Sequence, residues 1–202
     1  MGYYQDRILP HLLNLATRNE HLVPYRKRTL ALAYGRVLEI GIGSGQNLFF
    51  YSESVTELLG LDPHPKLLEI ASGKPSVLKP NLVKGSAEML PLEDKSVDTV
   101  VTTWALCSIP NVAAALEEAR RVVKPNGQFL FVEHGLSTDE SVRRWQHRLT
   151  PAWKRLAGGC HLDRPISELV GKAGFEITQM ATSYIRGPKP MTFTYEGTAR
   201  PV

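Results

Sequence analysis

The sequence predicts an α/β fold, in which a doubly wound, mostly parallel sheet of about seven strands carries helices on both faces. Short apolar and β-branched runs alternate with stretches of helical periodicity along most of the chain. The last two apolar runs, at 175–185 and 191–199, are separated only by RGPKP. These two runs resemble a hairpin, so at least one closing strand is expected to be antiparallel.

The expected elements follow one another without a long linker. Two helices, each interrupted by a proline, are expected before the first strand, at 8–16 and 23–34. Five apolar runs predict strands at 36–40, 55–62, 81–85, 97–104 and 128–134. Helices are expected from about residue 46 and over 63–72, 112–123, 139–160 and 165–174. The helix at 112–123 is expected to end at KPNG, where Pro125 and Gly127 break the pattern.

Composition limits the function classes. The chain has 202 residues, 43% of them hydrophobic, which suits one α/β domain with a sizeable core. The net charge is +4 without a basic cluster, so no nucleic-acid partner is expected. Cys107 and Cys160 have no zinc or CxxC spacing, which indicates free thiols, no metal site and a reducing, cytoplasmic setting. No apolar run approaches the ~18 residues that span a bilayer.

The stretch VLEIGIGSGQN, residues 37–47, carries the main functional signal. Glycine lacks a Cβ, so the chain can turn sharply after the first strand and a ligand can lie against bare backbone. A G-x-G-x-x-G dinucleotide pattern would need glycine where Gln46 stands, and no Gly-Lys-Ser/Thr of a P-loop follows. An NAD-dependent oxidoreductase is therefore disfavoured.

Two acidic residues near this turn suggest what kind of ligand it binds. Glu39 lies two residues before Gly41, where a carboxylate would repel a pyrophosphate and attract an ammonium or a sulfonium group. S-adenosylmethionine carries both cations. Asp62, at the end of the second strand, is placed to accept the ribose hydroxyls, although NAD folds use an acid in the same way. Asp62 could also act as the N-cap of the next helix.

Four segments then resemble a known family. LEIGIGSG, GLDPHPKLLEIA, GSAEMLPLEDKSVDTVVTTWALCSI and EEARRVVKPNGQFLFVEH are similar, in order and spacing, to the class I S-adenosylmethionine-dependent methyltransferases, over about residues 36–134. These enzymes have a Rossmann-like fold. FVEHG and WQHRLTPAWKRLAGGCHLDR further resemble the thiol S-methyltransferase-like branch, some of whose members associate with membranes. The resemblance implies one methyltransferase domain over 1–202, with an N-terminal helical lid (1–35), a cofactor-binding core (36–134) and substrate-side helices and closing strands (135–202).

The resemblance also implies roles for particular residues. The turn would border the methionine part of the cofactor, through Glu39, Gly41, Ile42, Gly43, Gly45 and Asn47. Asp62 would take the ribose, and the adenine would lie near Pro63, His64, Ser86, Ala87 and Glu88. Many relatives have Asp where this chain has Ser86, so here a serine hydroxyl or a backbone group would replace a carboxylate contact to the adenine amine. Glu88 is equally consistent with a solvent-facing acid. Thr103 and Trp104 would face the reacting centre.

The implied reaction is methyl transfer by in-line displacement to a small-molecule thiol, amine or hydroxyl, with S-adenosylhomocysteine as product. Alternatives are a phospholipid or quinone-precursor methyltransferase and a non-catalytic cofactor-binding module. A thiolate needs little further activation, whereas other acceptors would need a base. His134, at the end of the fifth strand, is the candidate, although it could equally be a hydrogen-bonded structural histidine. Tyr3 and Tyr4 are lid candidates by position. A monomer or homodimer and a peripheral membrane contact both remain open.

Overall fold

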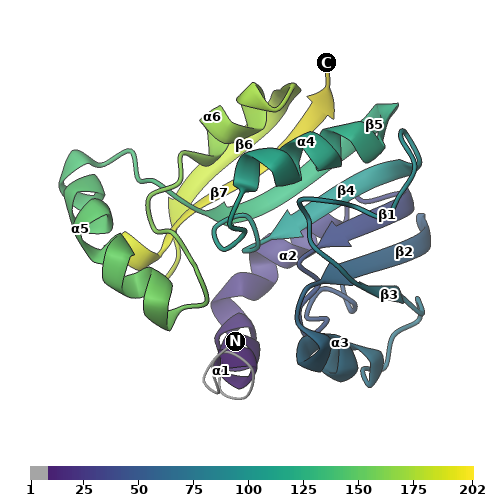
Figure 1. The fold of residues 1–202 in the computed structure, drawn as a ribbon, viewed down its shortest axis with the longest axis horizontal. Helices are drawn as coiled ribbons and strands as arrows, with labels where there is room; N and C mark the ends of the chain where they lie inside the picture. The colour runs from purple at the N-terminus through teal and green to yellow at the C-terminus, as the bar shows by residue number, and fades with distance from the viewer. Residues whose placement is uncertain (1–8) are drawn as a thin grey trace.

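The computed structural model describes residues 9–202, which form seven strands and six α-helices around one continuous sheet (Figure 1). The strand order is β3-β2-β1-β4-β5-β7-β6. The strands are β1 (Gly35–Ile40), β2 (Val55–Asp62), β3 (Asn81–Lys84), β4 (Val97–Thr103), β5 (Val123–His134), β6 (Phe175–Tyr184) and β7 (Phe193–Pro201). Strands β1 to β5 pair in parallel, and β7 is antiparallel to both of its neighbours, β5 and β6. The predicted fold class, with its antiparallel closing strand, is confirmed.

Helices cover both faces of the sheet, because successive side chains of a strand point to opposite faces. The α-helices are α1 (Leu9–Thr17), α2 (Val23–Leu30), α3 (Pro65–Ser72), α4 (Val112–Val122), α5 (Glu140–Leu156) and α6 (Ile166–Lys172). Leu38 and Ile40 of β1 belong to the core cluster that includes α4 and α6, whereas Val37 belongs to the cluster that includes α2 and α3. Glu39 therefore shares the face of Val37. Figure 1 shows α5 beyond the end of β5, away from both covered faces.

The helix expected from about Gln46 does not form. Residues 43–50 make consecutive turns instead, held by hydrogen bonds such as Gly45 N to Ile42 O (2.9 Å) and Phe50 N to Asn47 O (2.9 Å). Glycine, serine, asparagine and aromatic residues crowd this segment, and each of them has a weaker helix propensity than alanine or leucine. The connection between β1 and β2 is therefore irregular, and some of its side chains, such as those of Asn47 and Tyr51, point toward β1.

Strand β5 begins earlier than predicted. Val123 pairs with Val97 directly after α4 ends, and regular pairing resumes where Gln128 meets Thr99. The prediction ended the helix at 123 and began the strand at 128, so it missed this first pair. Residues 124–127 form an irregularity within the strand, of the kind that a β-bulge produces.

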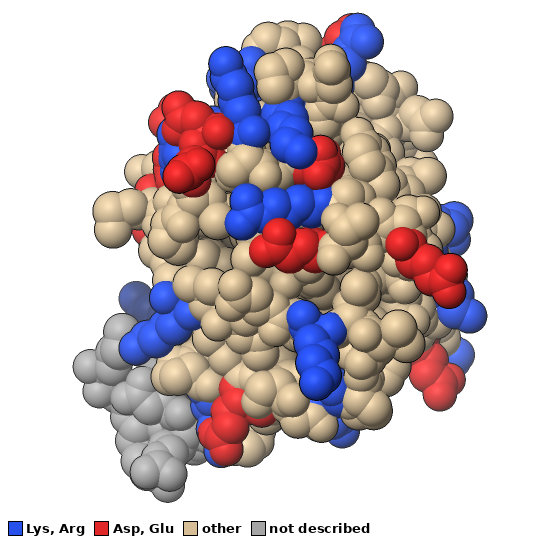
Figure 2. Space-filling model, turned by 90° about the vertical axis from the view of Figure 1, so that its right-hand side faces the viewer, with Lys and Arg blue, Asp and Glu red and all other residues tan. Residues whose placement is uncertain are grey.

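Two surface properties bear on partners. None of the helices within residues 9–202 combines the length and the apolar character needed to cross a bilayer. On the face shown in Figure 2, Lys and Arg side chains are interspersed with Asp and Glu. That face therefore carries no continuous field of one sign.

Candidate functional site

The glycine turn leaves β1 at the carboxyl end of the parallel sheet. Gly41, Gly43 and Gly45 have φ values of 75°, 55° and 72°, in the left-handed region that favours glycine. The backbone N–H groups of Gly41 and Ile42 both donate to Leu61 O, at 2.8 and 3.1 Å. The turn is therefore anchored to the neighbouring strand β2.

The three glycines meet different surroundings. A Cβ on Gly41 would lie 2.5 Å from Ala105 Cβ, and one on Gly45 would lie 2.8 Å from Leu48 Cδ1. The nearest atom to a Cβ on Gly43 would be a carbonyl oxygen 3.9 Å away. Packing inside the protein thus requires Gly41 and Gly45, whereas a Cβ at Gly43 would make only an ordinary van der Waals contact. The Ile42 side chain is buried in the core (3% exposed), so only its backbone could meet a ligand.

Glu39 lies beneath the turn and is 1% exposed. Its Oε1 accepts a hydrogen bond from Asn47 Nδ2 (2.8 Å), and its Oε2 accepts one from the Tyr51 hydroxyl (2.8 Å). Asn47 Nδ2 also donates to Thr103 Oγ1 (2.9 Å), which joins the turn to the end of β4. The fold thus brings together Glu39, Asn47 and Thr103, which the sequence analysis had named as site residues. A direct contact between Glu39 and a ligand stays a prediction, because both of its oxygens bond within the protein.

Arg26 of α2 completes this network and was missed by the sequence analysis. Its guanidinium donates to Asn47 Oδ1 (2.5 Å) and to Thr17 O (3.0 Å), and it lies 4.8 Å from the centroid of the Trp104 ring. The stretch YRKRT contains three basic residues, and only the fold shows which one is buried. Tyr51 was missed for the same reason, because the predicted helix would have placed it elsewhere.

Burial perturbs both charged members of the network. Burial raises the pKa of Glu39 to about 7, against the hydrogen bonds from Tyr51 and Asn47 and the charge of Arg26. Burial also lowers the pKa of Arg26 to about 10, so this guanidinium stays protonated at neutral pH. A buried cation therefore faces the acid across Asn47.

Asp62 joins the turn to the start of α3. Its Oδ2 accepts from Gly43 N (3.0 Å) and its Oδ1 accepts from His64 N (2.8 Å). Residue His64, and not Asp62, occupies the N-cap position of α3, so the N-cap alternative for Asp62 is wrong. An ionised carboxylate has about four lone-pair sites, so this side chain keeps capacity for further donors. Pro63 and His64 follow it directly in the chain, and their predicted contact with an adenine stays a prediction.

Ser86, Ala87 and Glu88 follow β3 on the same edge of the sheet. Gly85 N donates to Asp62 O (3.3 Å), which places this segment next to the end of β2. Glu88 accepts from Asn111 N (2.6 Å) and from the Ser86 hydroxyl (3.0 Å), so it ties the segment to the start of α4. Their predicted contacts with an adenine stay predictions.

Trp104 adopts a conformation that is uncommon outside glycine. Its φ is 51°, and its N–H donates to Val132 O (2.8 Å). Its ring packs edge-on against Tyr25 of α2, with centroids 6.4 Å apart. Backbone strain of this kind clusters at functional sites. The ring thus lies against Tyr25 and Arg26 of α2.

His134 ends β5 and is 6% exposed. Its Nε2 lies 3.4 Å from Pro190 O, so its hydrogen-bond partner belongs to the 3₁₀ turn η3 (Lys189–Met191). Burial lowers the pKa of His134, so the imidazole is neutral at pH 7. A role as general base stays a prediction. Tyr3 and Tyr4 lie outside the described residues.

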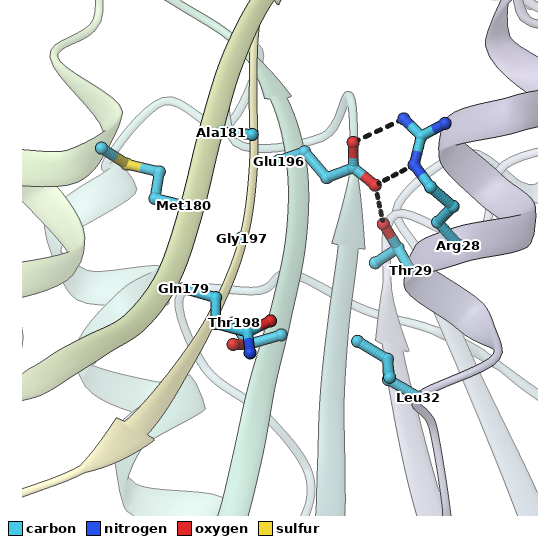
Figure 3. Close-up of a pocket in the computed structure, with 9 residues that line it drawn as sticks. All are labelled: Arg28, Thr29, Leu32, Gln179, Met180, Ala181, Glu196, Gly197 and Thr198. Atoms are coloured by element: carbon cyan, nitrogen blue, oxygen red, sulfur yellow. Dashed lines mark hydrogen bonds and ion pairs between the residues drawn. The ribbon is translucent and has the colours of Figure 1, made fainter.

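A hollow of about 340 Å³ lies elsewhere, between α2 and the β6–β7 edge (Figure 3). Arg28 forms a forked ion pair with Glu196 there, at 3.1 and 2.7 Å, and Thr29 donates to the same carboxylate (3.3 Å). None of the predicted site residues lines this hollow.

Within residues 9–202, no group of three or more His, Cys, Asp or Glu is arranged to hold a metal ion.

Comparisons with known proteins point to one family. Residues 38–131 match the family model described as "Methyltransferase domain". Thiol S-methyltransferase TMT1B of Rattus norvegicus is 33% identical over 150 residues, which cover 71% of this chain and 61% of that protein. Demethylmenaquinone methyltransferase of Oceanobacillus iheyensis is 35% identical over 113 residues, which cover 53% of this chain and 48% of that protein.

A solved structure supports the fold alone. The complex between the Haloferax volcanii Trm112 methyltransferase activator and a methyltransferase matches with a TM-score of 0.74 at 16% identity, covering 98% of this chain and 96% of that chain. The chain spans less than two thirds of the length of the curated relatives above. The ordered motifs, the strand order and the matched family together show that the chain belongs to the class I S-adenosylmethionine-dependent methyltransferases.

Proposed function

We propose that the protein transfers a methyl group from S-adenosylmethionine to a small thiol. The observation that carries the proposal is the bare backbone at Gly43, whose N–H donates to Asp62 and where an added Cβ would meet only a carbonyl oxygen 3.9 Å away. A ligand that approaches Gly43 can also meet the Asp62 carboxylate. This pairing suits a ligand with a ribose and an adjoining cationic part.

The chain's own residues would position the reactants. When bound, the cofactor supplies a methyl group already activated by the sulfonium. Asp62 would accept the ribose hydroxyls, and residues 86–88 would border the adenine. Trp104 and Tyr25 would exclude water on the α2 side, because their rings pack together there. Alignment of acceptor and donor can contribute roughly 7–11 kcal/mol to catalysis without any covalent role for the protein.

A thiol is the favoured acceptor for two reasons. The rat relative is a thiol S-methyltransferase by name. A thiolate is already a strong nucleophile, so the reaction does not depend on a nearby general base. The buried His134, bonded to a backbone carbonyl, suits such a reaction better than one that requires a mobile proton acceptor.

Calorimetry with S-adenosylmethionine, S-adenosylhomocysteine and NAD tests the cofactor. We expect the first two to bind and NAD not to bind; the reverse pattern would reject the proposal. A turnover screen with thiol, amine, phenol and phospholipid acceptors then tests the reaction. Cofactor binding without turnover of any acceptor would favour the non-catalytic alternative.

A quinone precursor is the second candidate acceptor, because a demethylmenaquinone methyltransferase is among the relatives. Adding a demethylated quinone to the same screen separates the two candidates. Turnover of the quinone that exceeds turnover of every thiol would reverse their order.

We propose a cytoplasmic monomer or homodimer. Light scattering after gel filtration measures the oligomeric state.

A peripheral membrane contact is the alternative location, since α5 exposes Trp145 (55%) beside exposed Arg144 and Arg148. Flotation with anionic liposomes tests it, and we expect the protein to stay in the lipid-free fraction.

A further inference from the structure

The two cysteines, far apart in the sequence, lie side by side in the fold. Cys107 follows β4 and is 4% exposed, whereas Cys160 follows α5 and is partly exposed. Both are free thiols, and the interaction with the other thiol is the largest influence on the pKa of each. The sequence analysis treated each of them as an isolated residue, because nothing in their spacing indicated a pair.

Backbone contacts hold the two cysteine segments together. His161 N donates to Cys107 O (2.7 Å), so the residue after one cysteine bonds to the other cysteine itself. The Arg164 guanidinium donates to Leu106 O and to Ile109 O, the second at 2.6 Å. Residues 106–109 and 160–164 are thus joined on both sides of the thiols. Their proximity does not depend on the side chains alone.

We propose that Cys107 and Cys160 form a redox-modification site, at which a low-molecular-weight disulfide oxidises the two thiols to an internal disulfide bond. The less buried member, Cys160, reacts first and the buried Cys107 second. Such a division between an accessible attacking thiol and a neighbouring resolving thiol is typical of redox-sensitive sites.

The electrostatic surroundings assign the same order. The hydrogen bond from Cys107 lowers the pKa of Cys160, with smaller help from the Trp153 indole and the charge of Arg164. The same hydrogen bond, together with burial, raises the pKa of Cys107. Because the thiolate is the nucleophile, Cys160 is the attacking residue.

The chemistry balances without a further reactant. The Cys160 thiolate attacks one sulfur of the small disulfide RSSR, the S–S bond breaks, and RS⁻ leaves with the electron pair. Cys107 then loses its proton, attacks the Cys160 sulfur of the mixed disulfide, and displaces the second RS⁻. Both leaving thiolates take up protons, so a protein dithiol and RSSR become a protein disulfide and two RSH. Two electrons pass from the protein to the small disulfide.

One consequence rests on the proposed function. Cys107 lies three residues after Trp104, so a disulfide would fix the segment after α5 against the loop that would face the acceptor. The oxidant belongs to the same chemical class as an oxidised thiol acceptor. Methyl transfer would therefore slow when the surrounding thiols are oxidised, and a reductant would restore it.

The test incubates the reduced full chain with oxidised glutathione and follows it by intact and peptide mass spectrometry without reductant. We expect the wild type to lose the mass of two hydrogen atoms and to yield a peptide linking Cys107 with Cys160. Cys107→Ser should accumulate a stable glutathione adduct on Cys160. Cys160→Ser should react far more slowly, because its remaining thiol is buried.

Other outcomes would overturn the proposal. These are a wild-type adduct on Cys160 that never resolves, a modification that starts at Cys107, or a disulfide between two chains. Circular dichroism checks that the variants fold, and the wild-type result stands without them. The mass measurement needs no acceptor and no cofactor. Failure of the redox site is therefore distinguishable from failure of the proposed function.

Discussion

Gly43 and Gly45 share a left-handed backbone, but their substitutions should have different effects. Gly43→Ala adds a methyl group on the open side of the turn, so we expect S-adenosylmethionine binding to weaken roughly tenfold or more, about 1.4 kcal/mol. Its cost to stability should be limited to backbone strain of about 1–2 kcal/mol. Calorimetry and urea denaturation measure the two effects separately.

Gly45→Ala is the matched control. Its added Cβ would also meet Leu48 and Ala71 at 2.8 and 3.1 Å, so overpacking adds roughly 1–3 kcal/mol to the strain. We therefore expect Gly45→Ala to destabilise the protein more than Gly43→Ala does. If the two variants lose equal affinity and equal stability, the assignment of Gly43 as the ligand-facing position fails.

His134 gives a second prediction for single residues. His134→Gln can keep a hydrogen bond to Pro190 O while it removes the imidazole. We expect kcat/KM for a thiol acceptor to change less than about tenfold, because loss of a general base costs roughly 10²–10⁴-fold. Steady-state kinetics at several pH values check this. A loss of the larger size would make His134 a base after all.

Glu39 shows what single positions in a sequence can and cannot indicate. Its contact with a ligand stays a prediction, although it does accept a hydrogen bond from Asn47 of the turn that follows it. Its hydrogen-bond partners could not be predicted, because the helix expected from about residue 46 would have placed Asn47 and Tyr51 elsewhere. The pattern of neighbouring residues located the acid, and the irregular path of the connection after β1 decides what it bonds to.

At the scale of elements, α2 is held on the turn by one buried arginine. Arg26→Met would leave Asn47 Oδ1 without this donor and would remove the cation near Glu39. Loss of one partner from a buried charge network costs roughly 3–5 kcal/mol. We expect a loss of this size in urea denaturation, together with weaker cofactor binding.

Arg28→Met on the same helix is the control. Arg28 pairs with Glu196 at the surface, and its side chain is 58% exposed. Exposed ion pairs contribute about 0–1 kcal/mol, so the expected loss is less than about 1 kcal/mol. An equal loss from both variants would mean that the network around Asn47 does not anchor α2.

Strands were predicted better than the connections between them. The β1, β2 and β4 runs combine apolar content with clear boundaries, and each lies within one or two residues of its predicted place. The prediction of a helix after β1 was wrong, because the side chains of Asn47 and Tyr51 turn inward and donate hydrogen bonds to Glu39. The predicted start of β5 was also wrong. Val123 already pairs with Val97, and the KPNG segment that follows forms an irregularity, although its Pro and Gly suggested that no strand had begun.

For the whole molecule, two buried carboxyl groups predict how stability changes with pH. Burial raises the pKa of Glu133 to about 8 and that of Glu39 to about 7, from an ordinary value of 4.5. Between pH 4.5 and 8 the folded protein holds more of these protons than the unfolded chain does. The free energy of unfolding should therefore fall as pH rises through this window, by a few kcal/mol.

Urea denaturation from pH 5 to pH 8.5 measures this slope. Glu39→Gln and Glu133→Gln should each flatten part of it, because an amide does not titrate. The contribution of each acid is complete below pH 4.5 and lost above its folded pKa. A slope that is unchanged in both variants would assign the pH dependence to other groups.

The strand order also has a consequence for synthesis of the chain. Strand β7 lies between β5 and β6, although β6 precedes it in the sequence. During synthesis, β6 therefore leaves the ribosome before β7, its neighbour in the sheet, has been made, and its edges stay unpaired until then. The nascent sheet can be extended past β5 only when residues 193–201 have left the exit tunnel.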